Sequence, residues 1–464
     1  MFLKIAFRNI LRNGRRSLMT LLAIAVGGIA IVLFGEFVGF VQASLETNAV
    51  QNVGHLTVFR RGFFDYGAGD PAGFGIANYE EVTGLVENDP EIRPFLDVIT
   101  PTVSLSGVIG NFEIDTSKTF LGTGYVPEDR EKMQRWDEHG VAQRRVLQDS
   151  GLRADDESRG VVGVGLARVL GLCAPLHIAD CPARPAPTTW VAPNAGSAPD
   201  VPREGVDNDA AAGAKADVPR LDMLAATANG APNVMSLYVT RAEPQGAREL
   251  DDNVVVMSFT LAQKLLYGRG EHQATGLVLQ LHRTEDLARV RGRLEALFRA
   301  HGLDLEVRDF AERQPFYRQA VGMFSAIFLF IALIMGVIVL FTVVNTMGTS
   351  VVERTSEIGT ARAMGLRRTG VRRLFVLEGS ILGAFGATAG VATGQIVAMA
   401  FNRAGATWTP PGSAAPVPLE VLTAHAGGLL AGVWVGLVVM ATIAAVVPAN
   451  RAARLQVVDA LRHV

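Results

Sequence analysis

Gln319–Val352 reads QAVGMFSAIFLFIALIMGVIVLFTVVNTMGTSVV, which is 34 consecutive residues without a charged side chain. Leu, Ile, Val and Phe dominate the run, and Arg318 and Glu353 bound it. The hydrocarbon core of a bilayer is about 30 Å thick, so an α-helix needs about 20 apolar residues to cross it. The stretch therefore predicts a membrane-spanning helix.

Three other runs pass the same test. Ser17–Gly35 is uncharged for 19 residues, Gly379–Asn402 for 24 and Val421–Asn450 for 30. The expected protein is an α-helical membrane protein whose four transmembrane helices cover residues 18–41, 324–344, 374–401 and 427–447.

The short basic segments predict how these spans are oriented. Residues 1–17 hold five Lys and Arg and no acid, and the loop 345–373 holds six Arg against two Glu. The tail 448–464 is also basic, whereas the loop 402–426 has one Arg and one Glu. Cytoplasmic loops carry the excess of Lys and Arg. Both termini and the loop 345–373 are therefore expected in the cytoplasm, and residues 42–322 outside it.

The first apolar run has two alternative interpretations. Val41 and Ala43 would suit a signal-peptide cleavage site, but the run is longer than the 7–15 residues typical of a signal peptide, which favours an uncleaved anchor. Apolar residues alternate with Lys and Arg at helical spacing within 1–17, which predicts an amphipathic helix lying on the inner membrane surface.

The segment 42–322 is acidic, with 28 Lys and Arg against 39 Asp and Glu. Strand-like and helix-like patterns recur near both of its ends, which predicts an α+β domain inserted between the first two spans. We expect a membrane-proximal lobe at about 42–111 and 261–322, and a distal lobe at about 112–260. The proline-rich stretch 182–219 is too poor in large apolar residues to bury a core.

The chain has two cysteines, Cys173 and Cys181. Outside the cytoplasm a disulfide between them is favoured over free thiols. His177 lies midway between them, so three metal ligands are an alternative, but no fourth ligand is close in sequence and a metal is not expected.

Small residues follow one face of the third span at steps of three and four. Such a stripe permits close helix packing in lipid, either within the chain or against a second permease copy or paralogue. Its members are Gly379, Gly383, Gly386, Gly390 and Gly394. Two acids lie within the predicted spans: Glu36 is expected to reach outward to the membrane surface, and Glu378 to anchor or pair with an arginine of 367–373.

The loop after Asn345 reads ERTSEIGTARAMG over residues 353–365. Arg354 and Glu357 can pair at i,i+3 on a short helix, and Gly365 would end it. The simplest interpretation of the segment is a solvated loop whose arginines set the membrane topology. The residues that stand out in it are Glu353, Arg354, Glu357, Ile358, Gly359, Arg362, Ala363 and Gly365.

This pattern resembles the FtsX-like permease family. The match consists of Asn345 at the inner end of a span, the run E-R-x-x-E-I-G-x-x-R-A-x-G, a basic patch, and Glu378-Gly379 at the next span. Residues 6–20 look like the family's opening, and Gly54-His55-Leu56 is similar to the MacB-type periplasmic core. The FtsX-like permease domain would cover about 324–457.

The resemblance implies the permease subunit of an ABC transporter in a bacterial inner membrane. The loop 345–373 would couple to a separate cytoplasmic ATPase, which would move extracytoplasmic cargo such as a lipoprotein, a peptide or another amphiphile by acting on the periplasmic domain. A periplasmic adaptor would be a further partner. The alternative is an FtsX-like signalling subunit that activates a periplasmic hydrolase and transports nothing.

The chain is expected to be a non-catalytic membrane subunit. The sequence shows no Gly-x4-Gly-Lys-Ser/Thr phosphate loop, so Mg-ATP would be bound by the partner ATPase and this chain would bind no cofactor itself. Its eight histidines are scattered and form no zinc-protease pattern, and nothing points to nucleic acid.

Overall fold

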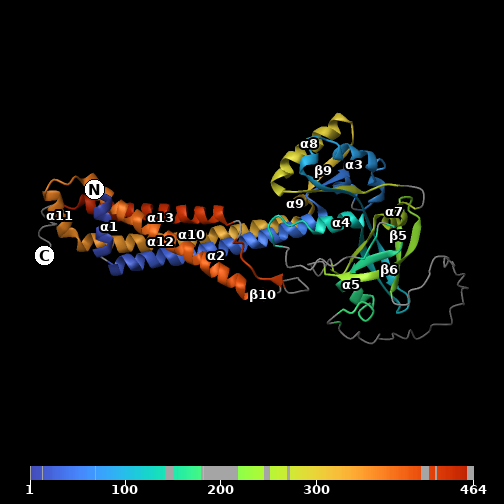
Figure 1. Cartoon of the computed structure of the whole chain (residues 1–464), viewed down its shortest axis with the longest axis horizontal. Helices are drawn as coiled ribbons and strands as arrows, with labels where there is room; N and C mark the ends of the chain where they lie inside the picture. The colour runs from blue at the N-terminus through green and yellow to red at the C-terminus, as the bar shows by residue number, and fades with distance from the viewer. Residues whose placement is uncertain are drawn as a thin grey trace, which may run out of the picture.

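The computed structural model describes residues 2–456 except 13, 68, 142–150, 154, 179–180, 182–217, 245–250, 269–271, 409–416 and 424–425. A bundle of long helices occupies one end of the molecule and an α/β domain the other (Figure 1). The predicted loop 182–219 falls almost wholly outside the described residues.

Four helices of the bundle are long and apolar enough to cross a membrane, as predicted. They are α2 (Gly14–Val53), α10 (Pro315–Glu353), α12 (Arg368–Ala404) and α13 (Gly427–Arg454). A shorter helix, α1 (Phe2–Arg12), packs against α12 and α2. Another, α11 (Thr355–Ala363), joins α10 to α12.

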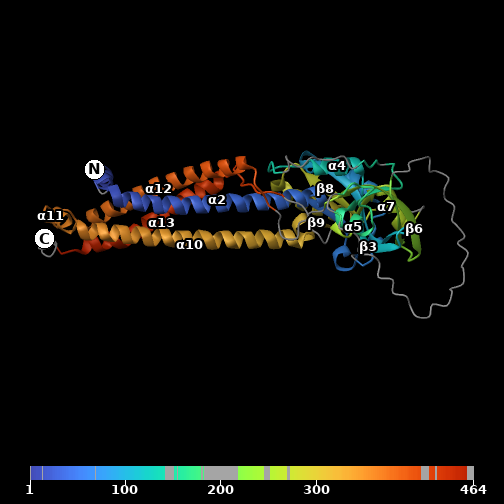
Figure 2. The same ribbon diagram turned by 90° about the horizontal axis from the view of Figure 1, so that it is seen from below.

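The helices α2 and α10 run on beyond the predicted spans. They contain 40 and 39 residues, which at 1.5 Å per residue is about 60 Å, or twice the thickness of a hydrocarbon core. They lie side by side along this length and reach the α/β domain (Figure 2). Phe34 stacks on Phe328 at 6.4 Å between ring centroids, and Gln42 donates to Ser325 at 3.0 Å. The two helices therefore connect the membrane bundle to the domain without a break.

Gly54 ends α2 and starts the α/β domain. Its φ of +69° is in the left-handed region, and a Cβ there would lie 2.4 Å from Val278 and 2.7 Å from the carbonyl oxygen of Leu279. Only glycine tolerates both constraints. The chain then enters β1 directly, so the end of the membrane helix is fixed against the sheet.

The domain is built on one nine-stranded sheet in the order β3-β7-β4-β6-β5-β2-β8-β1-β9. Because β2 also pairs with β3, the first six strands form a closed ring, and β8, β1 and β9 extend from it. The strands are β1 (Leu56–Arg60), β2 (Leu96–Asn111), β3 (Thr116–Tyr125), β4 (Arg159–Gly163), β5 (Arg220–Ala226), β6 (Pro232–Glu243), β7 (Val254–Ser258), β8 (Gly276–Leu281) and β9 (Leu305–Asp309).

The two largest hydrophobic cores among the described residues of the domain lie on this sheet. One is formed by the strand extension and by α3 (Tyr79–Glu87) and α8 (Leu287–Ala300), with Val82 and Leu294 fully buried between them. The other lies with the strand ring and α7 (Phe259–Tyr267) and includes Phe120. The 16-residue strand β2 contributes to both cores. The remaining helices are α4 (Pro127–Gln134), α5 (Val164–Val169) and α9 (Phe310–Arg313), and a two-stranded hairpin pairs β10 (Thr407–Trp408) with β11 (Val417–Pro418).

Glu36 does not reach outward, so this prediction is wrong. Its side chain is 1% exposed and accepts a hydrogen bond from Gln395 of α12. The helix around it continues to Val53, and the neighbouring span offers an amide at the same level. The Glu36 carboxylate is therefore hydrogen-bonded to Gln395 inside the bundle and does not extend to the membrane surface.

Candidate coupling site

The residues singled out in 353–365 gather at the end of the bundle that lies farthest from the α/β domain (Figure 1). Glu353 is the last residue of α10, and Arg354 forms the junction with α11. Glu357, Ile358, Gly359, Arg362 and Ala363 belong to α11, and Gly365 follows it.

Arg354 is the centre of a buried ion network. It is 8% exposed, and its Nη1 lies 3.2 Å from both carboxylate oxygens of Glu378 on α12. Its Nε donates to Glu357 at 3.3 Å, the i,i+3 pair expected from the sequence. The guanidinium also lies over the ring of Phe375, 5.4 Å from its centroid. One side chain thus joins the ends of α10, α11 and α12.

Glu378 pairs with Arg354 and not with an arginine of 367–373, which corrects the prediction. The residues from Arg368 onward form the first turns of α12 itself. Residues in the same helix meet only at spacings of three or four, and Glu378 is 4% exposed and turned toward the bundle. Asn9 of α1 also donates to its Oε1 atom, at 2.6 Å.

The helix α1 and the first turn of α2 are each held to the same site by a further ion pair. Arg12 donates to both oxygens of Glu357 at 2.6 and 2.7 Å, and Arg16 donates to Glu353. The Arg12 guanidinium is the main cause that holds the pKa of Glu357 below its usual range. These pairs are about half exposed, so they contribute little to stability but fix where α1 and the start of α2 sit.

One face of α11 is buried and the other is open. Thr355, Ile358 and Gly359 are buried against the bundle, and Arg362 donates to the carbonyl oxygen of Leu455 at the end of α13. Gly365, with a φ of +100°, turns the chain toward α12. The open face carries Met364, at 80% exposed, beside the exposed Thr360 and Ala363.

Residues 327–457 match the family model described as FtsX-like permease C-terminal. This range holds α11, its two flanking helices and Glu378. Similarity to FtsX/MacB-type permeases is thus shown for this part of the chain. The sequence resemblance is thereby confirmed.

Curated proteins are similar to this chain over about half of its length. The chain is 28% identical to the macrolide export ATP-binding/permease protein MacB of Hyphomonas neptunium over 235 residues, which are 50% of this chain and 34% of the relative. It is 31% identical to a MacB of a Shewanella species over 47% of this chain and 33% of the relative. An uncharacterized ABC transporter permease of Methanocaldococcus jannaschii is 23% identical over 47% of this chain and 53% of its own length. The matched part thus spans a third to a half of these relatives.

The glycine stripe of the permease packs within the chain. Gly379 and Gly383 face Ala445 and Ala441 of α13, where an added Cβ would approach within 2.3 and 2.6 Å. The other three, Gly386, Gly390 and Gly394, face Ile24, Ala25 and Val32 of α2. The described residues of α12 therefore use the stripe to hold two neighbouring spans, which was one of the two alternatives.

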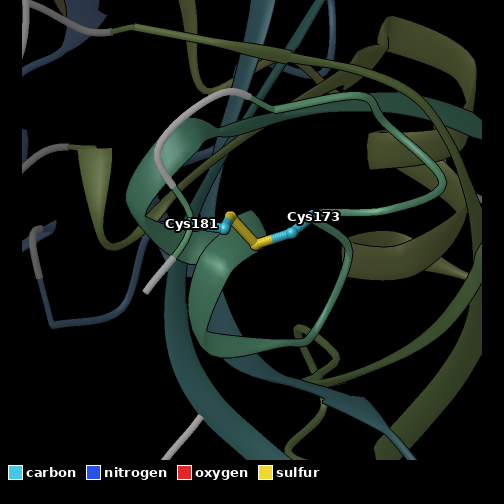
Figure 3. The surroundings of a disulfide bond; sticks show 2 residues. All are labelled: Cys173 and Cys181. Atoms are coloured by element: carbon cyan, nitrogen blue, oxygen red, sulfur yellow. A yellow bond between two sulfur atoms is a disulfide. The ribbon is translucent and has the colours of Figure 1, made fainter. Parts of the chain in front are cut away.

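Cys173 and Cys181 are joined in a disulfide that closes a short loop after α5, with 6.1 Å between their Cα atoms (Figure 3). Both sulfur atoms are used by this bond, so neither serves as a thiolate ligand beside His177. The bond lies in the domain and not in the membrane bundle.

A second polar network, which the sequence did not predict, joins α2 to the domain. Glu46 of α2 accepts from Thr284 Oγ1 at 2.6 Å, and His139 lies 3.3 Å from the same carboxylate. Glu138 accepts from the Thr284 backbone at 2.8 Å. These residues come from distant parts of the chain, so no local spacing signals them.

Glu46, Glu138 and His139 also form the one group, among the described residues, whose ligand atoms lie close enough together to hold a metal. Thr284 already donates to both carboxylates. His139 is held by Glu46, which raises the pKa of its imidazole. The group therefore serves as a joint between α2 and the α/β domain.

Proposed function

We propose that this chain is the permease subunit of an ABC transporter that carries motion from a cytoplasmic ATPase to an extracytoplasmic domain. The observation that carries the proposal is the Arg354 network, which ties α11 to α10 and α12 at one end of the bundle. The helix α10 then continues for 39 residues to the α/β domain. A displacement of α11 would thus be passed along a continuous helix.

The proposed orientation places α11 and both termini in the cytoplasm of a bacterial cell and the α/β domain on the outer side of its inner membrane. The Lys and Arg excess of residues 1–17 and 345–373 supports it, because basic loops remain on the cytoplasmic side. A disulfide in the domain suits an oxidising compartment.

The ATPase is proposed to be a partner that binds Mg-ATP and seats α11 in a groove. The open face of α11 carries the exposed Ser356, Thr360 and Ala363, with the exposed Met364 directly after the helix. The exposed Glu357 of the same helix is paired with Arg12. The names of the MacB relatives join an ATP-binding part to a permease part. Such pairing supports an ATP-binding partner for the permease part described above.

The cargo is proposed to be handled outside the membrane, as a lipoprotein, a peptide or another amphiphile, by a complex that contains a second permease copy or paralogue and an adaptor. The continuity of α2 and α10 with the domain supports this, because the helices move the domain and need not form a pore themselves.

The test is a cross-link from the open face of α11. Met364→Cys gives a free thiol in a chain whose two native cysteines are bonded to each other. We expect a photoactivatable cross-linker on this thiol to capture an ABC ATPase in membranes, identified by mass spectrometry. As a matched control, Phe112→Cys puts a thiol at a residue of similar exposure, 75%, on the distant domain.

Capture of an ATPase from position 364 but not from position 112 supports the proposal. Capture from position 112 instead, or no ATPase from position 364 while the labelled protein remains folded, would reject it.

A further inference from the structure

Glu36 is a buried carboxylate of the helix bundle, near the outer end of the predicted span 18–41, and the proposed coupling does not use it. One oxygen accepts from Gln395, and the other, Oε2, has no hydrogen-bond partner among the described residues. A carboxylate in a low-dielectric environment is costly unless a cation or several donors face it. This oxygen can therefore accept one more hydrogen bond.

A cavity of about 280 Å³ adjoins this carboxylate. Its walls are mainly apolar and include Val38, Phe328, Leu422 and Leu429. Gln42 and Ser325, which hydrogen-bond to each other at 3.0 Å, form a polar edge. The backbone N–H of Leu422 donates to the carbonyl oxygen of Glu36 at 3.1 Å, which holds the segment before α13 against the cavity.

The chemistry of the lining selects one class of ligand. Glu36 is the one charged group among the described lining residues, so a divalent metal, which needs several anionic or neutral oxygen ligands, is poorly served. An anion would be repelled. An ammonium group would satisfy the open oxygen and neutralise the charge, and apolar walls suit an attached hydrocarbon chain.

We propose that this cavity binds the protonated amine of an amphiphile, with Glu36 as its counter-ion. The volume corresponds to about nine waters at about 30 Å³ each, enough for an ammonium head and the first carbons of a chain. The amine belongs to a single-chain amphiphile or to an aminophospholipid of the membrane, and the test separates these sources. The inference stands on the cavity alone and does not depend on ATP-driven coupling.

The test measures binding of radiolabelled dodecylamine to the full chain in nanodiscs of phosphatidylglycerol, which has no amine. We expect saturable binding that is about tenfold tighter than that of dodecanol, the uncharged analogue of the same length. Glu36→Gln keeps an acceptor for Gln395 and should reduce dodecylamine affinity about tenfold, to the level of dodecanol.

Two further variants separate loss of the site from loss of the fold. Gly39→Leu fills the cavity from α2, where a Cβ would meet Leu422 at 3.8 Å, and should weaken both ligands. Gly436→Leu adds the same side chain where nothing lies within 4 Å and should change neither. His425, which lies outside the described residues, is replaced by Gln as a check on a protein-supplied partner.

Competition identifies the source of the amine. Displacement of dodecylamine by phosphatidylethanolamine assigns the site to the lipid, and no displacement assigns it to a single-chain amphiphile. Equal binding of dodecylamine and dodecanol, unchanged affinity in Glu36→Gln, or tighter dodecylamine binding after His425→Gln would overturn the proposal.

Discussion

At the residue scale, two Arg–Glu pairs of the candidate coupling site differ in how much they contribute to stability. Arg354 and Glu378 are 8% and 4% exposed, whereas the side chains of Arg12 and Glu357 are 55% and 49% exposed. A solvated pair contributes about 0–1 kcal/mol, while removal of one partner of a buried pair costs about 3–5 kcal/mol. Burial, and not the 2.6 Å contact of the exposed pair, decides which residue the fold needs.

We therefore predict that Arg354→Ala lowers the free energy of unfolding by about 3 kcal/mol or more, because it leaves the Glu378 carboxylate buried with only the Asn9 amide. Arg12→Ala should lower it by less than about 1 kcal/mol. Denaturant unfolding of the full chain in detergent measures both. Equal losses would show that the Arg354 pair is not buried in the protein as it exists in the micelle.

At the scale of elements, α12 is the centre of the bundle because glycines let two helices approach its backbone. At Gly390 an added Cβ would lie 2.7 Å from the carbonyl oxygen of Ala25 and 3.2 Å from the Cα atom of Gly28. Both atoms belong to backbone, so α2 would have to move as a whole. Among the described glycines of α10 and α13, none has an atom of α2 within 4 Å of its Cβ position.

We predict that Gly390→Ala destabilises the bundle by about 1–3 kcal/mol through overpacking. Gly432→Ala on α13 is the matched control, because nothing lies within 4 Å of its Cβ position and alanine favours helix. Thermal unfolding in detergent compares the two variants. A Gly390→Ala protein as stable as the control would mean that α2 and α12 are farther apart than described.

At the scale of the whole molecule, a joint of buried side chains connects the bundle to the domain. His55, fully buried, accepts from the backbone N–H of Leu281 at Nδ1 and lies 3.2 Å from Thr284 Oγ1. Its ring meets Trp136 edge to face at 4.9 Å. Burial lowers the pKa of His55 to about 4, and the nearby Glu46 carboxylate opposes this only in part.

The joint should weaken in acid. Unfolded His55 takes up a proton near pH 6.5 and the folded residue only near pH 4, so between these values the unfolded chain binds more protons. The contribution of neutral, buried His55 to the free energy of unfolding is fully present above pH 6.5. At pH 5 it is smaller by about 2 kcal/mol. His139 acts in the opposite direction, since its raised pKa stabilises the fold below pH 6.5 and this is lost as pH rises.

The measurement is the unfolding midpoint of the full chain at pH 7.5 and pH 5, followed by tryptophan fluorescence. His55→Gln retains an acceptor for Leu281 and cannot titrate, so its midpoint should fall less than that of the natural chain. His139→Gln should enlarge the decrease of the unfolding midpoint between pH 7.5 and pH 5. Parallel pH dependence in the natural chain and in His55→Gln would contradict the assignment.

Several features of the fold follow from local composition. The four long apolar helices were predictable because the cost of placing charges in hydrocarbon depends on each segment by itself. The i,i+3 contact of Arg354 with Glu357 was predictable for a similar reason, since it lies within about one helical turn. The full length of α2 and α10 could not be predicted from the sequence, because contacts between the two helices and with the domain stabilise their outer turns.

What the amino-acid sequence determined by itself is the set of membrane spans, the short helix between two of them and the family motif it carries, since each is encoded by neighbouring residues. The tertiary structure alone decided the partners of the buried charges. Asn9 meets Glu378 across 369 positions and Gln395 meets Glu36 across 359, and Glu46 reaches Thr284 across 238. Such pairs depend on how whole helices pack, and no spacing along the chain records that geometry.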